Sequence, residues 1–118
     1  MEVFPMEFVT SETPDGKVFI VEGPGRLEAN ISEDFRKMIN RLVDEGKTCL
    51  IINMAKTEFM DSSGLGALVS RIAATRSNGG DVRLACPSPF ILNLLKMTHL
   101  DKVFKRFDDV SSAIKSFD

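Results

Sequence analysis

Residue types that build many enzyme sites are scarce in this chain. Its 118 residues include no tryptophan, no tyrosine, one histidine and two cysteines. His99 is the only possible base for a serine–histidine arrangement, and its neighbours favour a turn with a partly buried ring. One histidine and two separated cysteines, Cys49 and Cys86, do not make a metal site. We therefore expect no catalytic residues, no metal and two free thiols that pack as small hydrophobes.

Long hydrophobic runs and an excess of charge are also absent. No apolar run approaches the roughly 20 residues of a membrane-spanning helix. The first five residues lack the basic start and the small-residue cleavage site of a signal peptide. The net charge of −2 gives no reason to expect nucleic acid or an anionic membrane as a partner. These features predict a cytoplasmic protein with one domain spanning residues 1–118.

The glycine patterns of nucleotide sites and hydrolase sites are missing as well. Gly23-Pro24-Gly25 follows a predicted strand, but the third glycine of a dinucleotide loop would fall at Glu28, which repels anions. The chain has no Gly-x-x-x-x-Gly-Lys phosphate loop and no Gly-x-Ser-x-Gly elbow. The sequence therefore predicts no bound cofactor.

The apolar residues that are present alternate between strand and helix spacings. Strands are predicted at 6–9, 17–22, 49–52 and 82–86, with a short edge strand within 103–107; helices are predicted after Asn30 up to Gly46, from about 63 to 77, at 89–97 and after Asp108 or Asp109. A Thr13–Gly16 turn makes the first pair antiparallel, and the later strand–helix–strand steps should be parallel. The order predicts a single-domain α/β fold: an open mixed sheet of four to five strands with about four helices packed on it.

Local signals refine three of these elements. Asn30 is predicted to cap the first helix, with Glu33 in the reciprocal capping position. Pro89 is suited to the first turn of its helix. The run from Cys49 to Ile52 has no polar alternation, so it predicts a strand that is covered on both faces.

The string Phe59-Met60-Asp61-Ser62-Ser63-Gly64-Leu65-Gly66 joins a predicted strand region to a predicted helix. A hydroxyl at a helix N-terminus lies near unpaired backbone N–H groups, which can receive an anion. Aspartate and serine before a helix are also ordinary N-caps, and for Asp61-Ser62-Ser63 alone capping is the simpler interpretation. The whole string favours a serine phosphorylation switch on a protein-binding surface.

The segment from Met60 to Gly66 resembles the central motif of the STAS domain family, in its bacterial anti-sigma-factor-antagonist branch. The segment Gly25–Glu28 is similar to the family's Gly-x-Leu-Asp loop, with Glu28 in place of the usual aspartate. The segment Leu95–Phe104 is similar to the family's C-terminal part, so the resemblance covers nearly the whole chain. It implies a small mixed sheet with helices mainly on one face.

The resemblance also implies a partner-switching protein that is not an enzyme. In that scheme the unphosphorylated protein binds an anti-sigma factor that is also a serine kinase, and so frees a sigma factor. The kinase phosphorylates the serine before the glycine, here Ser63, with Ser62 as the second candidate. A metal-dependent serine phosphatase reverses the step. The alternative is a STAS scaffold or interaction subunit of a stress-signalling or transporter-associated assembly.

The predicted partner-binding residues surround the phosphorylation site: Glu28, Asn30, Met60, Asp61, Ser62, Gly64 and Leu65. Asp61 is expected to place the acceptor hydroxyl. Helical spacing turns Leu65 inward, so Met60 is expected to be the better surface contact of the two. We expect a monomer or a weak dimer.

Overall fold

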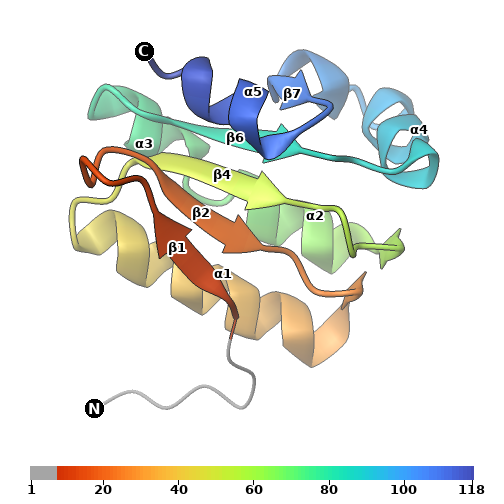
Figure 1. Ribbon diagram of the computed structural model, residues 1–118. Coiled ribbons are helices and arrows are strands. Elements are labelled where there is room, and N and C mark those ends of the chain that lie inside the picture. The colour runs from red at the N-terminus through yellow and green to blue at the C-terminus, as the bar shows by residue number, and fades with distance from the viewer. Residues whose placement is uncertain (1–7) are drawn as a thin grey trace.

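The structure is a computed structural model that describes residues 8–118. Its main sheet has the order β1-β2-β4-β6-β7, in which only β1 and β2 are antiparallel (Figure 1). The strands of this sheet are β1 (Thr10–Glu12), β2 (Phe19–Glu22), β4 (Cys49–Asn53), β6 (Asp81–Ala85) and β7 (Arg106–Phe107). The predicted open mixed sheet is therefore confirmed, and this main sheet has five strands within residues 8–118.

Within residues 8–118 the structure has five α-helices and one 3-10 helix. They are α1 (Ala29–Asp44), α2 (Ser62–Val69), α3 (Ile72–Ser77), α4 (Pro89–Met97), the 3-10 helix η1 (Leu100–Lys102) and α5 (Val110–Lys115). None of these helices is both long and apolar enough to cross a bilayer.

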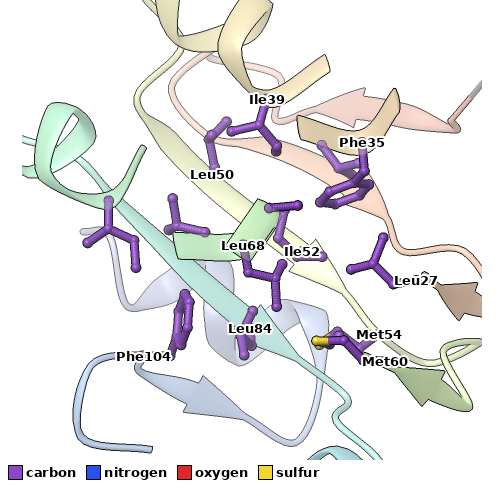
Figure 2. Packing of buried hydrophobic residues seen from close by; sticks show 14 of the residues in the cluster. Leu27, Phe35, Ile39, Leu50, Ile52, Met54, Met60, Leu68, Leu84 and Phe104 are labelled. Atoms are coloured by element: carbon purple, nitrogen blue, oxygen red, sulfur yellow. The ribbon is translucent and has the colours of Figure 1, made fainter. Parts of the chain in front are cut away.

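The central strand β4 divides the core into two parts. Leu50 and Ile52 face the main cluster, which α1, α2 and α4 cover; Figure 2 shows Phe35, Leu68 and Leu84 in it. Ile51 faces the opposite side and packs with Ala113 of α5. All three β4 residues are fully buried, which confirms the prediction of a strand covered on both faces.

The first strand is misplaced in the prediction for 6–9, because residues 8 and 9 are not in a strand. Residues 6 and 7 lie outside the described residues, and β1 begins only at Thr10. The turn sets this register, because Glu12 pairs with Phe19 at the end of the hairpin. Phe8 packs edge to face on Phe35 of α1, with 5.2 Å between the ring centres.

Helix boundaries differ from the predictions at two places. The helix predicted from 63 to 77 is divided into α2 and α3, because the backbone at Arg71 leaves the helical region (φ −125°, ψ 18°). The capping box of Asn30 and Glu33 is not formed. Instead α1 begins two residues earlier, with Glu28 as its N-cap, and the Glu28 carbonyl accepts from the amides of Ile31 and Ser32.

His99 is exposed and has a left-handed backbone (φ 63°), so the predicted partly buried ring is wrong. The two cysteines are free, as expected.

A second, very small sheet was not predicted. Strand β3 (Arg26–Leu27) pairs in parallel with β5 (Phe59–Met60), with Arg26 opposite Phe59 and Leu27 opposite Met60. Both strands follow the carboxyl ends of main-sheet strands, β2 and β4, and they lie together at the right-hand edge of Figure 1. This mini-sheet places the 25–30 loop beside the 61–63 segment.

Candidate functional site

The mini-sheet has an inner face and an outer face. Leu27 and Met60 point into the main core, where they are 0% and 2% exposed. Because side chains alternate along a strand, Arg26 and Phe59 lie on the outer face. There the Arg26 guanidinium lies 4.4 Å from the centre of the Phe59 ring and forms an ion pair with Glu28 (2.9 Å). The residue that follows β5 is Asp61, the first residue of the predicted switch segment, Asp61–Ser63.

Asp61 is the N-cap of α2, and its carboxylate organises the segment. Its Oδ1 accepts a hydrogen bond from the Gly64 amide (3.0 Å) and another from the Ser63 hydroxyl (2.5 Å). Its own amide donates to the Leu27 carbonyl (3.4 Å), which ties α2 to β3. The capping interpretation and the switch interpretation therefore apply to the same residue, since the cap also fixes the Ser63 side chain.

Ser63 presents its hydroxyl at the surface, in the first turn of the eight-residue helix α2. Unpaired amides and the positive end of the helix dipole tolerate added negative charge at this position. Ser62 is also exposed, but its hydroxyl makes no hydrogen bond within residues 8–118. Of the two serines, only Ser63 has a side chain held in place by Asp61.

The pKa of the Asp61 carboxyl is lowered from its ordinary value. The largest cause is the hydrogen bond from the Ser63 hydroxyl, followed by the bond from the Gly64 amide. Hydrogen bonds to the charged form stabilise that form, so Asp61 is an anion at neutral pH. If another group replaced the hydrogen of the Ser63 hydroxyl, this carboxylate would lose its main stabilising hydrogen bond.

Gly64 is buried where β3, β5 and α2 meet. A Cβ atom added there would collide with the Leu27 carbonyl oxygen and would lie 2.6 Å from Cγ of Met60. The missing side chain thus allows close approach of this chain's own backbone. At Gly66 an added Cβ would meet nothing within 4 Å, so that glycine is not required by the packing.

The other predicted contact residues fall in different places. Met60 is 2% exposed, so the expectation that it is a surface contact is wrong: in the mini-sheet it alternates inward with Leu27. Leu65 is partly exposed although it packs against the core. Asn30 is exposed in the first turn of α1, and Glu28 lies at the N-terminus of that helix.

Phe90 is a surface residue near this site that the sequence reasoning missed. Its ring lies 5.7 Å from the Phe59 ring, and its side chain is 47% exposed. No local sequence pattern indicates the Phe59–Phe90 contact, but the outer face of the mini-sheet follows a repeated pattern. Arg26-Leu27-Glu28 and Phe59-Met60-Asp61 both place an apolar residue between two residues that face outward.

Comparison with known proteins places this chain in a protein family. The STAS domain matches residues 9–113 of this chain. The chain belongs to the STAS domain family, in its anti-sigma-factor-antagonist branch. A Lysinibacillus sphaericus protein named anti-sigma F factor antagonist is 31% identical over 98 residues, which cover 82% of this chain and 80% of that protein.

Solved structures agree on the fold. The Thermotoga maritima protein TM1081 has a TM-score of 0.83 at 25% identity and covers 93% of both chains. The Bacillus cell fate determinant SpoIIAA, solved in its phosphorylated form, has a TM-score of 0.73 at 24% identity, covering 95% of this chain and 100% of that one. At that identity the second likeness concerns the fold alone.

Proposed function

We propose that this protein is an anti-sigma-factor antagonist that works as a partner switch and is not an enzyme. The name of its Lysinibacillus relative supports the partner class. In the unmodified state the protein binds an anti-sigma factor with serine kinase activity in the cytoplasm, and so releases a sigma factor. Phosphorylation of Ser63 ends the binding, and a metal-dependent serine phosphatase restores it.

The observation that supports Ser63 most strongly is its hydrogen bond to Asp61 at an exposed helix N-terminus. Phosphorylation adds about −1.5 to −2 charges. It also replaces a donor with an anion, so the contact with the Asp61 carboxylate becomes repulsive. Glu28 lies at the neighbouring helix terminus, but its carboxylate is paired with Arg26 at 2.9 Å, so the repulsion comes mainly from Asp61. The added charge therefore lies where the partner docks, and release needs no refolding of the domain.

Phosphoryl transfer provides the direct test. The protein is incubated with Mg-ATP and the serine-kinase anti-sigma factor from the same genome, and the modified residue is mapped by fragment mass spectrometry. We expect one phosphoryl group on Ser63, none in Ser63→Ala, and an unchanged yield in the matched variant Ser62→Ala. Phosphate mapped to any residue other than Ser63 would reject the assigned site.

Binding tests the second half of the proposal. Ser63→Ala should retain the kinase when ATP is present, whereas the phosphorylated wild type should bind at least about tenfold more weakly. Ser63→Asp should weaken binding only partly, because it adds less charge than a phosphoryl group. Equal affinity of the modified and unmodified protein would remove the switch, and no binding by either would favour the scaffold alternative.

A further inference from the structure

Exposed apolar side chains are concentrated on one helix. Within residues 8–118, four large hydrophobic side chains are exposed, and α4 carries three of them: Phe90 (47%), Leu92 (38%) and Met97 (70%). Phe90, Asn93 and Met97 have the spacing of one helix face, and the Asn93 amide contacts the Met97 sulfur at 3.4 Å. We call these three residues the α4 ridge. The opposite face of the helix supplies the core, since Ile91 and Leu95 are fully buried.

The α4 ridge begins beside the strand that leads to the proposed phosphorylation site. At its N-terminal end Phe90 packs on Phe59, with 5.7 Å between the ring centres. Phe59 lies on the outer face of the mini-sheet, and Asp61, which holds the Ser63 hydroxyl, follows two residues later. The N-terminal end of α4 therefore contacts the strand that leads directly to the Ser63 segment.

The switch segment alone offers little surface for a stable complex. A standard interface buries about 800 Å² on each partner. At the start of α2 the exposed side chains are the small ones of Ser62 and Ser63, while Met60 and Gly64 are buried. The α4 ridge, which runs from Phe90 to Met97, adds a surface about 10 Å long. A protein that reaches Ser63 can therefore gain most of its apolar contact area next to the switch.

We propose that Phe59 and the α4 ridge form the apolar half of the docking surface for the kinase that phosphorylates Ser63. The occupant is an apolar segment of that kinase, and this inference rests on the function proposed above. The two halves have separate tasks. The ridge supplies contact area that modification does not change, whereas Ser63 supplies the charge that ends the contact.

Substitutions on the ridge test this division. Met97→Gln and Phe90→Ser remove apolar area outside the switch, and Val9→Gln is the matched control. Val9 is 65% exposed and immediately precedes β1, and its carbonyl accepts a hydrogen bond from the Glu22 amide. Strand β1 is at the edge of the main sheet opposite β7, away from α4. Affinity for the serine-kinase anti-sigma factor is measured by calorimetry without ATP. We expect each ridge variant to bind at least about tenfold more weakly and the control to bind like wild type.

Phosphorylation kinetics separate docking from chemistry. With Mg-ATP added, Met97→Gln should raise the KM for Ser63 phosphorylation and leave kcat unchanged. Thermal unfolding checks that the variants are folded. Phe90 contacts Phe59 and contributes to packing, but Met97 is 70% exposed and can be changed without loss of the core.

Three other results would overturn the inference. If wild type is phosphorylated on Ser63 and both ridge variants bind the kinase like wild type, the ridge is not the docking surface, while the proposed function stands. If the ridge variants abolish self-association and keep full kinase affinity, the occupant is a second copy of this chain. If wild type neither binds the kinase nor accepts phosphate, the proposed function itself fails.

Discussion

Gly64 shows how a single residue can serve both the core and the proposed switch. Its missing side chain lets the Leu27 carbonyl pass close to α2, and that contact helps to hold Asp61 against β3. Gly64→Ala should therefore destabilise the fold. Overpacking costs about 1–3 kcal/mol, of which the better helix propensity of alanine returns up to about 1 kcal/mol. We expect a net loss of about 1–2 kcal/mol in the free energy of unfolding, measured by urea denaturation.

Gly66→Ala is the matched control for that substitution. It lies in the same helix, and an added methyl group would meet no atom within 4 Å. The gain in helix propensity should stabilise this variant by about 0.5–1 kcal/mol. Equal effects of the two substitutions would contradict the close packing at Gly64.

The hydrogen bond between Ser63 and Asp61 predicts a pKa change. Ser63→Ala removes the largest cause of the lowered Asp61 pKa, so that pKa should rise but stay below its ordinary value, because the Gly64 amide still donates. A carbon-detected NMR titration measures the shift. Asp109, whose pKa is lowered mainly by the Ser112 amide, should titrate unchanged as a control. An unaltered Asp61 pKa would show that the hydroxyl is not bound to this carboxylate in solution.

The direction of the linked stability change follows from the sign of this shift. In wild type the folded Asp61 pKa lies below the unfolded value of about 3.9. The carboxylate therefore stabilises the fold above the unfolded pKa, and this contribution is lost as the pH falls through the folded pKa. Ser63→Ala should reduce that contribution at neutral pH, and so should show a smaller loss of stability on acidification.

At the scale of elements, strong local sequence signals predicted helices and strands well, whereas very short elements were missed. The unbroken apolar run of β4 is a covered strand, and the Thr13–Gly16 turn closes the β1–β2 hairpin. The strands β3 and β5 have two residues each, too few to show any periodicity. Their pairing depends on contacts between segments about thirty residues apart in sequence, which local patterns do not encode.

The candidate site was predictable to the same extent. The order Asp61-Ser62-Ser63-Gly64 at a helix start indicates both the cap and the exposed hydroxyl. The inward position of Met60 was missed, because it depends on the unpredicted β3–β5 pairing. Phe90 was missed for a similar reason, since the contact between α4 and β5 joins distant parts of the chain.

The start of α4 offers a prediction about one element. Ser88 is its N-cap and accepts a hydrogen bond from the Ile91 amide (3.2 Å), followed by Pro89 in the first turn. Ser88→Ala should lower the free energy of unfolding by about 1 kcal/mol through loss of the cap. Ser111→Ala, at an exposed helical position of α5, should change it by less than about 0.5 kcal/mol. Chemical denaturation of both variants measures the difference, and equal stabilities would contradict the assigned cap.

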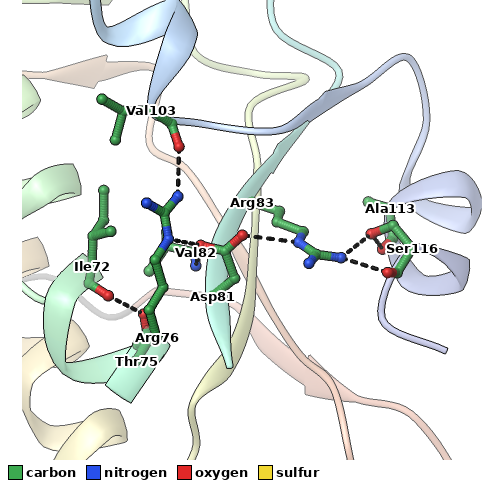
Figure 3. Close-up of polar contacts among 9 residues, drawn as sticks. All are labelled: Ile72, Thr75, Arg76, Asp81, Val82, Arg83, Val103, Ala113 and Ser116. Carbon is green, nitrogen blue, oxygen red and sulfur yellow. Dashed lines mark hydrogen bonds and ion pairs between the residues drawn. The ribbon is translucent and has the colours of Figure 1, made fainter. Parts of the chain in front are cut away.

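At the scale of the whole molecule, the two ends of the sheet have different roles. The proposed switch lies beyond the carboxyl ends of the parallel strands, whereas Asp81 begins β6 at their amino ends. Asp81 is 5% exposed and pairs with Arg76 of α3 (2.8 Å) and with Arg83 (3.1 Å), as Figure 3 shows. The Arg83 guanidinium also donates hydrogen bonds to the carbonyl and hydroxyl oxygens of Ser116. The Arg76 guanidinium donates one to the Val103 carbonyl. These contacts tie α3, on one face of the sheet, and Ser116 at the end of α5, on the other face, to the start of β6.

Removing the central charge of this network should weaken the fold without affecting the switch. Asp81→Asn leaves the nearly buried Arg83 side chain, 12% exposed, without its carboxylate. Breaking a buried pair from one side costs about 3–5 kcal/mol; because Arg76 is 44% exposed and water can solvate it, we expect about 2–3 kcal/mol here. Asp44→Asn, at a 68% exposed partner of Arg71, should cost less than about 0.5 kcal/mol.

Two measurements on these variants separate stability from switching. Urea denaturation should show the large loss for Asp81→Asn and the small one for Asp44→Asn. The rate of Ser63 phosphorylation, measured well below the unfolding temperature, should be the same in both, because β6 separates Asp81 from the switch end by five residues, about 17 Å. A reduced rate in folded Asp81→Asn would mean that the two ends are coupled through the sheet, and the added phosphoryl charge would then act on more than the docking surface.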